Sequence, residues 1–323
     1  MIGHVAPAER VSVVIANWNG ACYLSRCLDA VLGQSSPAAE IVVVDNGSTD
    51  GSVSQLKGRY PEVALIQNSE NEGTSRAWNL AIDRTAGDFV LILNTDVFLD
   101  RDFLLSALEA ARTSQDIGLV APRILCAETG QVENVGLVLQ RRLRAANGPY
   151  ENRAFAFAGS GSALLCRRTM LRDIQTGMEY FDESFFAYWE DIDLAWRAQL
   201  RGWQCLYEPG ALAQHIGSGS QGGKVRVVDK TPFFQRHIWK NRYLTFAKNA
   251  SPGVILSLLP WLVLAELLSW PYLLFRAPGR LSVLLDARAS FLRMLPLALG
   301  KRRTIQARRK IGARRVLRFF VGF

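Results

Sequence analysis

The chain has 323 residues, enough for one large or two modest domains, and its 49% hydrophobic and 21% charged residues are typical of a globular protein. Its formal net charge is +9, but Gly300–Phe323 holds nine basic residues and no acidic one, which leaves 29 basic against 29 acidic residues before it. This balance argues against a main domain that attracts polyanions such as nucleic acids.

The cysteines and the N-terminus both indicate a reducing compartment. The five cysteines are odd in number and include no Cys-x-x-Cys pair, which favours free thiols over a disulfide framework or a zinc site. The first twenty residues contain no basic segment followed by an apolar stretch. We therefore expect no export signal and a location in the cytoplasm.

The first 122 residues alternate between short apolar runs and helical patterns. Each of the first four runs ends in a polar loop, whereas the fifth ends at Pro122. Strands that alternate with helices predict a mainly parallel sheet flanked by helices, with ligands bound beyond the carboxyl ends of the strands. The expected strands are Val11–Ala16, Ile41–Val44, Val63–Ile66, Phe89–Leu93 and Gly118–Ala121.

The next part of the chain has strand segments without intervening helices, as expected of a mixed sheet. It contains a basic, turn-rich loop at 141–153 and a glycine-rich stretch at 215–224, which predicts either a loop near a ligand or a plain linker. A helix is expected over Thr231–Ala250. Before it we expect an extended segment at Val132–Gln140, a strand after the GSGS stretch within Phe155–Cys166, and two short strands at Gln204–Tyr207 and Ala211–Gln214.

The C-terminal region is apolar and then basic. Gly253–Phe275 is long enough to span a bilayer, but two prolines and Glu266 interrupt it, and basic residues flank it on both sides. A second apolar segment, Leu281–Leu299, contains three charged residues. We predict helices that lie in the cytoplasmic leaflet of a membrane, with the basic tail held by anionic lipid. A single membrane span and a soluble helical subdomain are the alternatives.

The stretch Phe185–Gly202 places three carboxylates, Glu190, Asp191 and Asp193, on the first turn of an expected helix. The apolar residues that follow recur at helical spacing, and Gly202 is a suitable stop. Acidic residues at this position also complement the helix dipole, so capping is the simplest reading of this stretch by itself.

Six motifs occur along the chain in a fixed order. They are NWNG at 17–20, VVVDNGSTDGS at 42–52, NEG at 71–73, LILNTD at 91–96, GSGSALL at 159–165 and WEDIDLAWR at 189–197. Together they resemble the inverting, GT-A fold glycosyltransferases of family 2, and the variants are most similar to the bacterial rhamnosyltransferases.

The resemblance covers Val11–Tyr243 and implies an α/β, GT-A (Rossmann-like) domain over 1–250, whose sheet is mixed, mainly parallel and flanked by helices. Residues 1–122 would form its nucleotide-sugar half and 123–250 its acceptor half. Residues 251–323 would then be the membrane-associating helices and the basic tail.

The resemblance also implies a donor site in the strand-end loops. Asp45 would accept a hydrogen bond from the imide N–H of uracil or thymine, although an Asp-Asn-Gly sequence also favours a plain turn. Arg76 would contact phosphate or lie on a solvated helix face. The residues expected to line the donor are Asn17, Asn19, Asp45, Asn71, Gly73, Arg76, Asn94 and Asp96.

The metal candidate is Asn94-Thr95-Asp96. Family members commonly have Asp-x-Asp here, and two such carboxylates hold a divalent cation, Mg or Mn, that bridges the diphosphate. This chain has Asn94 first, which leaves Asp96 as the main carboxylate. His215 is a possible additional ligand. We therefore expect either weak metal affinity or ligation that the donor completes.

By the same resemblance, Asp191 would be the general base that inversion requires, and Glu190 and Asp193 would orient the acceptor or tune Asp191 by like-charge repulsion. The candidates for acceptor contact are Tyr188, Trp189, Gly159 and Ser160. Two basic clusters could meet a phosphate, namely Arg141, Arg142 and Arg144 in the loop and the Lys240–Tyr243 run.

The expected activity is transfer of a sugar, L-rhamnose from dTDP-rhamnose, onto a polyprenyl-diphosphate-linked saccharide at the cytoplasmic face of the bacterial inner membrane. Such a reaction belongs to the synthesis of surface polysaccharides such as O-antigen. Transfer of another sugar from UDP-glucose or UDP-galactose is the alternative within this class. A nucleic-acid-binding protein is disfavoured because the basic residues are confined to the tail, and a dinucleotide-dependent oxidoreductase because no G-x-G-x-x-G follows the first strand.

Overall fold

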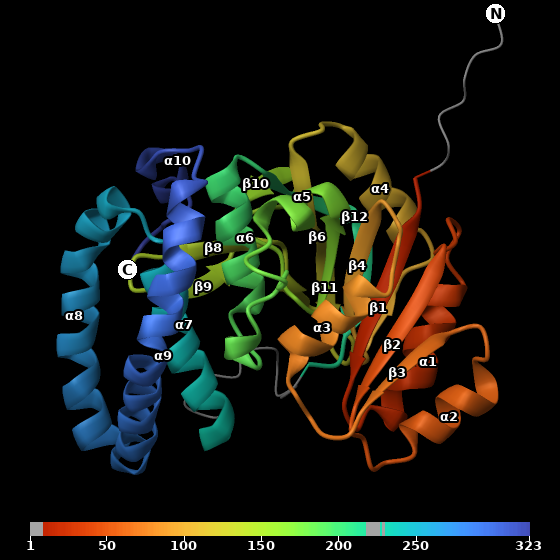
Figure 1. Ribbon diagram of the computed structural model, residues 1–323, viewed down its shortest axis with the longest axis horizontal. Coiled ribbons are helices and arrows are strands. Elements are labelled where there is room, and N and C mark those ends of the chain that lie inside the picture. Colours follow the sequence, from red (N-terminus) through yellow and green to blue (C-terminus); the bar gives the residue numbers. More distant parts are fainter. Residues whose placement is uncertain (1–8, 218–226, 228–229) are drawn as a thin grey trace, which may run out of the picture.

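The structure is a computed structural model that describes residues 9–217, 227 and 230–323. Residues 1–8 of the segment considered above for an export signal, and residues 218–224 of the glycine-rich stretch, lie outside the described residues. Figure 1 shows a central twisted sheet with helices on both faces and a further layer of C-terminal helices on one side.

The N-terminal part alternates strands and helices, as the apolar pattern predicted. Its inner strands are rich in Val, Ile and Leu, which suits strands that are buried on both faces. The elements are β1 (Val11–Asn17), α1 (Ala21–Leu32), β2 (Glu40–Asn46), α2 (Ser52–Arg59), β3 (Ala64–Asn68), α3 (Thr74–Asp83), β4 (Phe89–Asn94), β5 (Val97–Leu99) and α4 (Phe103–Arg112).

The second part begins with strands and ends with helices. Its elements are β6 (Ile117–Cys126), β7 (Val132–Asn134), β8 (Leu137–Gln140), β9 (Arg144–Asn147), β10 (Ala154–Ala156), β11 (Ala163–Arg167), α5 (Arg168–Ile174), α6 (Glu190–Arg201), β12 (Gln204–His215), α7 (Pro232–Asn249), α8 (Pro252–Arg276), α9 (Leu281–Ala307) and α10 (Ala313–Leu317). The expected helix over Thr231–Ala250 is therefore confirmed as α7.

In the described part of the chain, ten strands form one sheet with the main order β10-β12-β6-β11-β4-β1-β2-β3. β4, β1, β2 and β3 run parallel, and β11 lies antiparallel between β4 and β6. The sheet is mixed and mainly parallel, as predicted. Because the ends of β1, β2 and β4 share one edge with the start of β11 and the end of β12, the loops at these ends are brought together.

The strand boundaries around Pro122 differ from the prediction. β6 continues through Pro122, and the two short strands expected at 204–214 are one strand, β12. The register between β6 and β12 shifts between Glu208 and Leu212, which pair with Pro122 and Arg123. Proline has no N–H to donate to the ladder, so the irregularity in β12 lets both strands continue past it.

Each face of the sheet has its own hydrophobic core. On one face, Leu28 of α1, Leu56 of α2 and Leu104 of α4 belong to the same buried cluster. On the other face, Trp78 of α3 and Trp196 of α6 belong to a second cluster. Both sides of the sheet are thus covered, and the strand ends remain as the place for a site.

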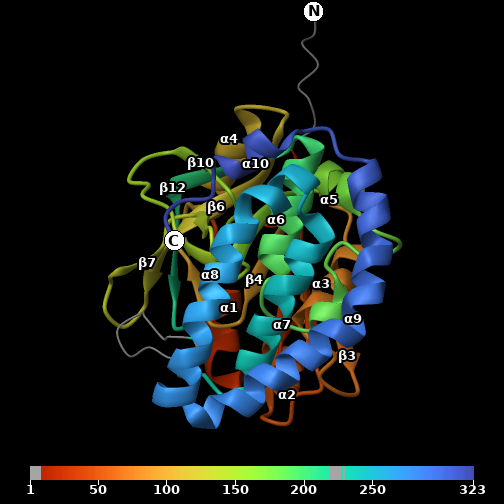
Figure 2. The ribbon, with the colours of Figure 1, turned by 90° about the vertical axis from the view of Figure 1, so that its left-hand side faces the viewer.

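The C-terminal helices form an outer layer beyond α6. Figure 2 shows α8, α7 and α9 side by side on this face, and α9 packs against α7. Among the described residues, α8 is the one helix long and apolar enough to cross a membrane, and only 11% of its most apolar window is buried. The division of the chain at residue 250 stays a prediction.

The basic tail returns to the α/β part of the chain. Leu139 and Phe320 form a parallel bridge, and the ring of Phe320 lies edge-on to Trp196 of α6 with centroids 5.7 Å apart. Phe319 is in the same buried cluster. The segment that follows α10 therefore completes the core on the α6 face.

Candidate active site

Asn17 and Asp45 join the loops that follow β1 and β2. Asn17 is 1% exposed, and its Nδ2 donates to Oδ1 of Asp45 at 2.7 Å. The second oxygen of Asp45 accepts the backbone N–H of Ser48 at 3.0 Å, and Ser48 in turn accepts the backbone N–H of Asn19. The predicted base-binding carboxylate is thus buried in the loop that it shapes.

Asn71 and Gly73 connect the donor loops to the segment before α6. Asn71 accepts the N–H of Gly73 at 3.0 Å, and the next residue, Thr74, donates its N–H to the carbonyl of Phe186 at 2.7 Å. Gly73 has φ +90°, and a Cβ there would lie 2.6 Å from that carbonyl oxygen. Only glycine fits this approach between the start of α3 and the loop before α6.

Arg76 carries two carboxylate partners. Its guanidinium pairs with Glu72 at 3.0 Å and with Glu183 at 3.0 Å, and its side chain is 42% exposed. These pairs hold Arg76 beside the segment before α6. Its predicted contact with phosphate stays a prediction.

Asp96, His215 and Glu133 form a line at the carboxyl end of β12. His215 Nε2 lies 3.3 Å from Asp96 Oδ2, and Nδ1 lies 2.7 Å from Glu133 Oε1. Burial favours the neutral ring, but the hydrogen bonds with Asp96 and Glu133 outweigh it and raise the pKa of His215 to about 9. The structure therefore brings together the two side chains predicted as metal ligands, and adds a second carboxylate behind the histidine.

These residues can contribute to a metal site but do not complete one. Within the described ranges, no group of three or more His, Cys, Asp or Glu side chains is arranged to hold an ion. A carboxylate oxygen and an imidazole nitrogen both suit Mn, and Glu133 fixes the far ring nitrogen as carboxylates commonly do behind metal-bound histidines. The donor set fits a divalent cation whose remaining ligands come from elsewhere, such as a diphosphate.

Asp191 lies at the start of α6 and reaches back to the sheet. Its Oδ2 accepts the N–H of Gly161 at 2.9 Å, and its Oδ1 accepts the N–H of Ile192 at 2.7 Å. Ser162, next to Gly161, accepts the N–H of Asn94 with its carbonyl at 2.9 Å. The Gly161-Ser162 segment thus connects Asp191 to the end of β4, where the metal candidates lie.

The predicted acceptor residues Gly159 and Ser160 belong to the same turn. Ser160 and Ser162 share a hydrogen bond between their hydroxyls at 2.9 Å. Gly159 is packed against Ala121 and Leu164, so a Cβ there would lie 2.6 Å from the Leu164 side chain. Gly159 supports the turn through close packing, and Ser160 stays a candidate for acceptor contact.

Burial raises the pKa of both Glu190 and Asp191, and Asp191 also perturbs Glu190. Burial, and then the charge of Asp191, raise the pKa of Glu190 to about 8, and among the described residues its Oε2 has no hydrogen-bond partner. Burial also raises the pKa of Asp191, although the N–H groups of Gly161 and Ile192 oppose the rise. Because the charge of Asp191 opposes ionisation of Glu190, Asp191 is the carboxyl of the pair that ionises first.

The loop before α6 is strained and is held from outside. Phe186, Tyr188 and Trp189 have φ of +66°, +68° and +74°, values that residues with a Cβ adopt at a cost of about 1–3 kcal/mol each. Asn241 of α7 donates to the carbonyls of Phe185, Ala187 and Tyr188 within 3.0 Å. This clamp fixes Tyr188 and Trp189, the predicted acceptor aromatics, next to the first turn of α6.

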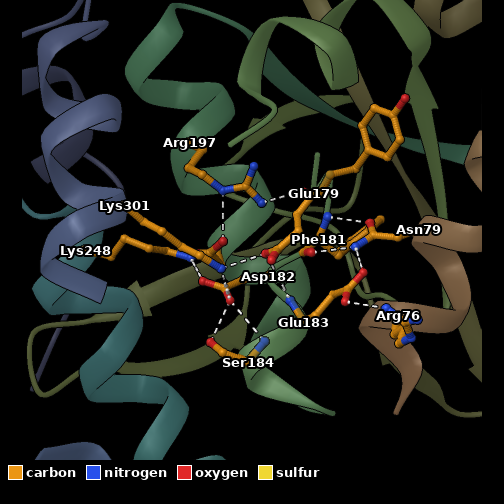
Figure 3. A network of polar contacts seen from close by, with 12 residues as sticks. Arg76, Asn79, Glu179, Phe181, Asp182, Glu183, Ser184, Arg197, Lys248 and Lys301 are labelled. Atoms are coloured by element: carbon orange, nitrogen blue, oxygen red, sulfur yellow. Dashed lines mark hydrogen bonds and ion pairs between the residues drawn. The ribbon is translucent and has the colours of Figure 1, made fainter. Parts of the chain in front are cut away.

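Asp193 lies in a buried network of charges, shown in part in Figure 3. It pairs with Arg197 at 2.9 Å and with Lys248 at 2.9 Å, and accepts a hydrogen bond from Asn249 at 2.7 Å. Lys248 also pairs with Asp182, which pairs with Lys301 of α9 at 2.7 Å. We call Asp182, Asp193, Arg197, Lys248 and Lys301 the Asp182 network; it joins α6, α7 and α9.

Comparison with known proteins decides the family. The model of glycosyl transferase family 2 matches residues 12–174 of the chain, half of its length. The chain belongs to glycosyl transferase family 2. A relative from Mycobacterium tuberculosis, N-acetylglucosaminyl-diphospho-decaprenol L-rhamnosyltransferase, is 27% identical over 240 residues, which cover 65% of this chain and 77% of the relative. The protein is thus a glycosyltransferase that resembles rhamnosyltransferases.

Solved structures of other glycosyltransferases share the fold. GalNAc-T7 with UDP, GalNAc and Mn2+ superposes with a TM-score of 0.59 at 16% identity, over 74% of this chain and 48% of that one. The mannosyltransferase from Pyrobaculum calidifontis with GDP-Man and Mn2+ gives 0.53 at 20% identity, over 93% and 80%. The predicted GT-A fold of this family 2 glycosyltransferase is confirmed.

The sequence of this family 2 glycosyltransferase did not indicate two features of the site: the position of Glu133 and the structural role of Lys240 and Asn241. Glu133 lies 82 positions from His215, in a strand of three residues, and no local pattern marks it. Lys240 and Asn241 were candidates for binding phosphate, but Lys240 donates to the carbonyl of Ser184 and Asn241 holds the loop. An amphipathic pattern would have marked the buried face of α7. The helix shows no such pattern, because its buried residues include polar and charged side chains such as Lys240 and Asn241.

Proposed function

We propose that this glycosyltransferase transfers its sugar with inversion, and that Asp191 is the general base. The observation that carries the proposal is the hydrogen bond of 2.9 Å from Gly161 to Asp191, because it fixes the carboxylate beside the strand end where donor loops converge. Direct displacement needs a base on the acceptor side to take the proton of the attacking hydroxyl. Glu190, which is neutral at pH 7, leaves that role to Asp191.

The proposed donor is dTDP-L-rhamnose. The supporting observation is the likeness to the mycobacterial rhamnosyltransferase. Asn17, Asn19, Asp45, Asn71, Gly73 and Asn94 would line the donor, and Arg76 would reach its phosphates. Asp96 and His215 would hold a Mg or Mn ion, which would neutralise charge on the departing diphosphate. Glu133 would keep His215 Nε2 directed at that ion.

The proposed acceptor is a polyprenyl-diphosphate-linked saccharide at the cytoplasmic face of the bacterial inner membrane. The relative acts on such a substrate by its name, and α8 exposes the side chains of Leu256, Leu267 and Phe275 along its length. An exposed apolar helix beside a basic tail suits the surface of an anionic membrane. Tyr188, Trp189 and Ser160 would contact the acceptor sugar.

Donor binding and transfer test this proposal. We expect dTDP-rhamnose with Mn to stabilise the full chain in detergent by about 2.7 kcal/mol at a concentration of 100 times its Kd, and to support transfer to N-acetylglucosamine linked to farnesyl diphosphate. Thermal unfolding with dTDP-, UDP- and GDP-sugars, each with and without Mn, compares the donors. If only UDP-glucose or UDP-galactose stabilised the protein and was transferred, that sugar would take the place of rhamnose in the proposal.

Glu133 offers a test of the metal site that does not depend on the sugar. We expect Glu133→Gln to weaken Mn affinity about 10- to 100-fold, because the neutral amide no longer holds the His215 ring as a carboxylate does. Electron paramagnetic resonance of free Mn in a titration measures this affinity with UDP or dTDP present. The control is Glu128→Gln, which makes the same exchange of a carboxylate for an amide in the turn between β6 and β7. Equal affinities in the two variants would remove Glu133 from the metal site.

A further inference from the structure

The turn between β8 and β9 concentrates positive charge next to the apolar helix α8. Arg141, Arg142 and Arg144, which we call the arginine turn, lie in or beside the two-stranded β8–β9 sheet. Among the described residues, none of the three pairs with a carboxylate, whereas Arg76, Arg197 and Arg201 all do. The arginine turn therefore has charge that protein groups leave uncompensated.

A fourth arginine, Arg242 of α7, is close enough to Arg142 for their charges to interact. Burial, and then the charges of Arg144 and Arg242, lower the pKa of Arg142. The Nε of Arg242 is buried and has no hydrogen-bond partner within the described ranges, although its Nη2 lies 3.6 Å from Glu266. Arg242 and the arginine turn thus form one positively charged region, and several guanidinium groups in one region suit a multiply charged anion.

The arginine turn borders a pocket against the apolar helix α8. Arg141 lies over the ring of Trp261 at 5.0 Å, and Arg142 lies over Phe323 at 5.3 Å. A pocket of about 330 Å³ opens between these elements. It is lined by Arg141, Ser257, Leu258, Trp261, Leu317 and Phe320. The pocket therefore has the guanidinium group of Arg141 in its lining, Arg142 close by over Phe323, and aliphatic and aromatic side chains in its wall.

The positively charged surface of the arginine turn adjoins the apolar surface of α8 at this pocket. α8 contributes Leu258 and Trp261 to the pocket, and turns Leu259 and Val263, each 50% exposed, away from the protein. An anionic head at the arginines would thus have its hydrocarbon part directed along α8. A lipid with one such head, rather than a sheet of headgroups, suits a pocket of this size.

We infer that the arginine turn, Arg242 and Trp261 form the subsite for the diphosphate and first isoprene units of an isoprenoid-diphosphate acceptor. The inference rests on the proposed function and adds where its acceptor is held. Arg242 follows Asn241, the clamp on the loop before Asp191, in α7, so this helix links the subsite to the segment that carries the base. The arginines pair with the diphosphate oxygens, and α8 covers the isoprenoid.

Direct binding of farnesyl diphosphate to the full chain in detergent tests the subsite without any donor. We expect Arg142→Gln with Arg144→Gln to weaken binding at least about tenfold, as loss of charge-assisted hydrogen bonds does, and Arg142→Lys with Arg144→Lys to recover part of it. Arg84→Gln with Arg101→Gln, which removes two exposed charges elsewhere, should bind as the unchanged chain does. Thermal unfolding checks that each variant is folded.

Three results would overturn the inference. They are equal weakening in the Arg84/Arg101 variant, equal affinity of the unchanged chain for inorganic pyrophosphate, and a loss that appears only as weaker binding to phosphatidylglycerol vesicles. The first two would show general attraction of anions, and the third a docking surface for bulk lipid. Because the assay contains no nucleotide sugar, normal farnesyl diphosphate binding without sugar transfer would count against the proposed function alone.

Discussion

Asp191→Asn should lower the transfer rate by about 10²–10⁴-fold, the usual contribution of a positioned base. Asparagine keeps the size of the side chain, and its oxygen can still accept the N–H of Gly161, so the start of α6 should stay in place. It cannot take the proton of the acceptor hydroxyl. The measurement is kcat for the accepted donor, together with donor affinity from thermal unfolding, which should not change.

Glu190→Gln is the matched control, because glutamine resembles the neutral carboxyl that Glu190 carries at pH 7. We expect it to keep most of the activity at that pH. In the unchanged protein the rate should decline as pH rises through about 8, where Glu190 ionises beside Asp191. It should also fall in acid, as Asp191 is protonated through its raised pKa. In Glu190→Gln the decline in rate above about pH 8 should disappear, whereas the decline in acid should remain.

Near-normal transfer by Asp191→Asn would remove Asp191 as the base. Loss of activity in Glu190→Gln with an active Asp191→Asn would move the role to Glu190. Both variants inactive with intact donor affinity would mean that the pair acts as a unit. Each outcome therefore assigns the base differently.

Lys248→Met should lower the free energy of unfolding by about 3–5 kcal/mol, as removal of one partner from a buried ion pair does. Lys248 is 1% exposed and pairs with both Asp182 and Asp193. Methionine fills the space but leaves two buried carboxylates with less positive charge around them. Urea unfolding measures the change, and Lys57→Met, an exposed lysine in α2, should stay within about 0.5 kcal/mol of the unchanged chain.

The pH dependence of the unfolding free energy provides a second test of Lys248→Met. Burial opposes ionisation of Asp182 and Asp193, but Lys248, with Lys301 and Arg197, holds their pKa values below the usual range. Such carboxylates add stability above an unfolded pKa of about 3.9, and the contribution is lost as pH falls through their lowered values. The difference between Lys248→Met and the unchanged chain should therefore shrink below about pH 4. A difference that persists there would assign the effect to packing.

The parts of the fold set by local pattern were predictable from the sequence. The β-branched runs gave the strands, and the polar residues after Ala16, Val44 and Leu93 gave the loops at one edge. The spacing of Glu190, Asp191 and Asp193 placed them correctly on the first turn of α6. These features depend on residues a few positions apart, which a single sequence displays.

The rest depends on contacts between distant segments. Asp193 shares its first turn with Asp191, yet Lys248 and Asn249 draw it into the Asp182 network. The charge of the tail suggested contact with lipid, but its aromatic residues Phe319 and Phe320 enter the core. No periodicity in the chain carries this information, because partners 50 or more positions apart are chosen by the packed fold.

The return of Phe320 to Trp196 also bears on the order in which the protein can be completed during synthesis. The chain leaves the ribosome from its N-terminus, so α8 and α9 emerge before the residues that close the core around α6. The apolar helix can therefore meet a membrane while the transferase domain is still unfinished. Activity would then begin only after the segment that follows α10 has joined that core.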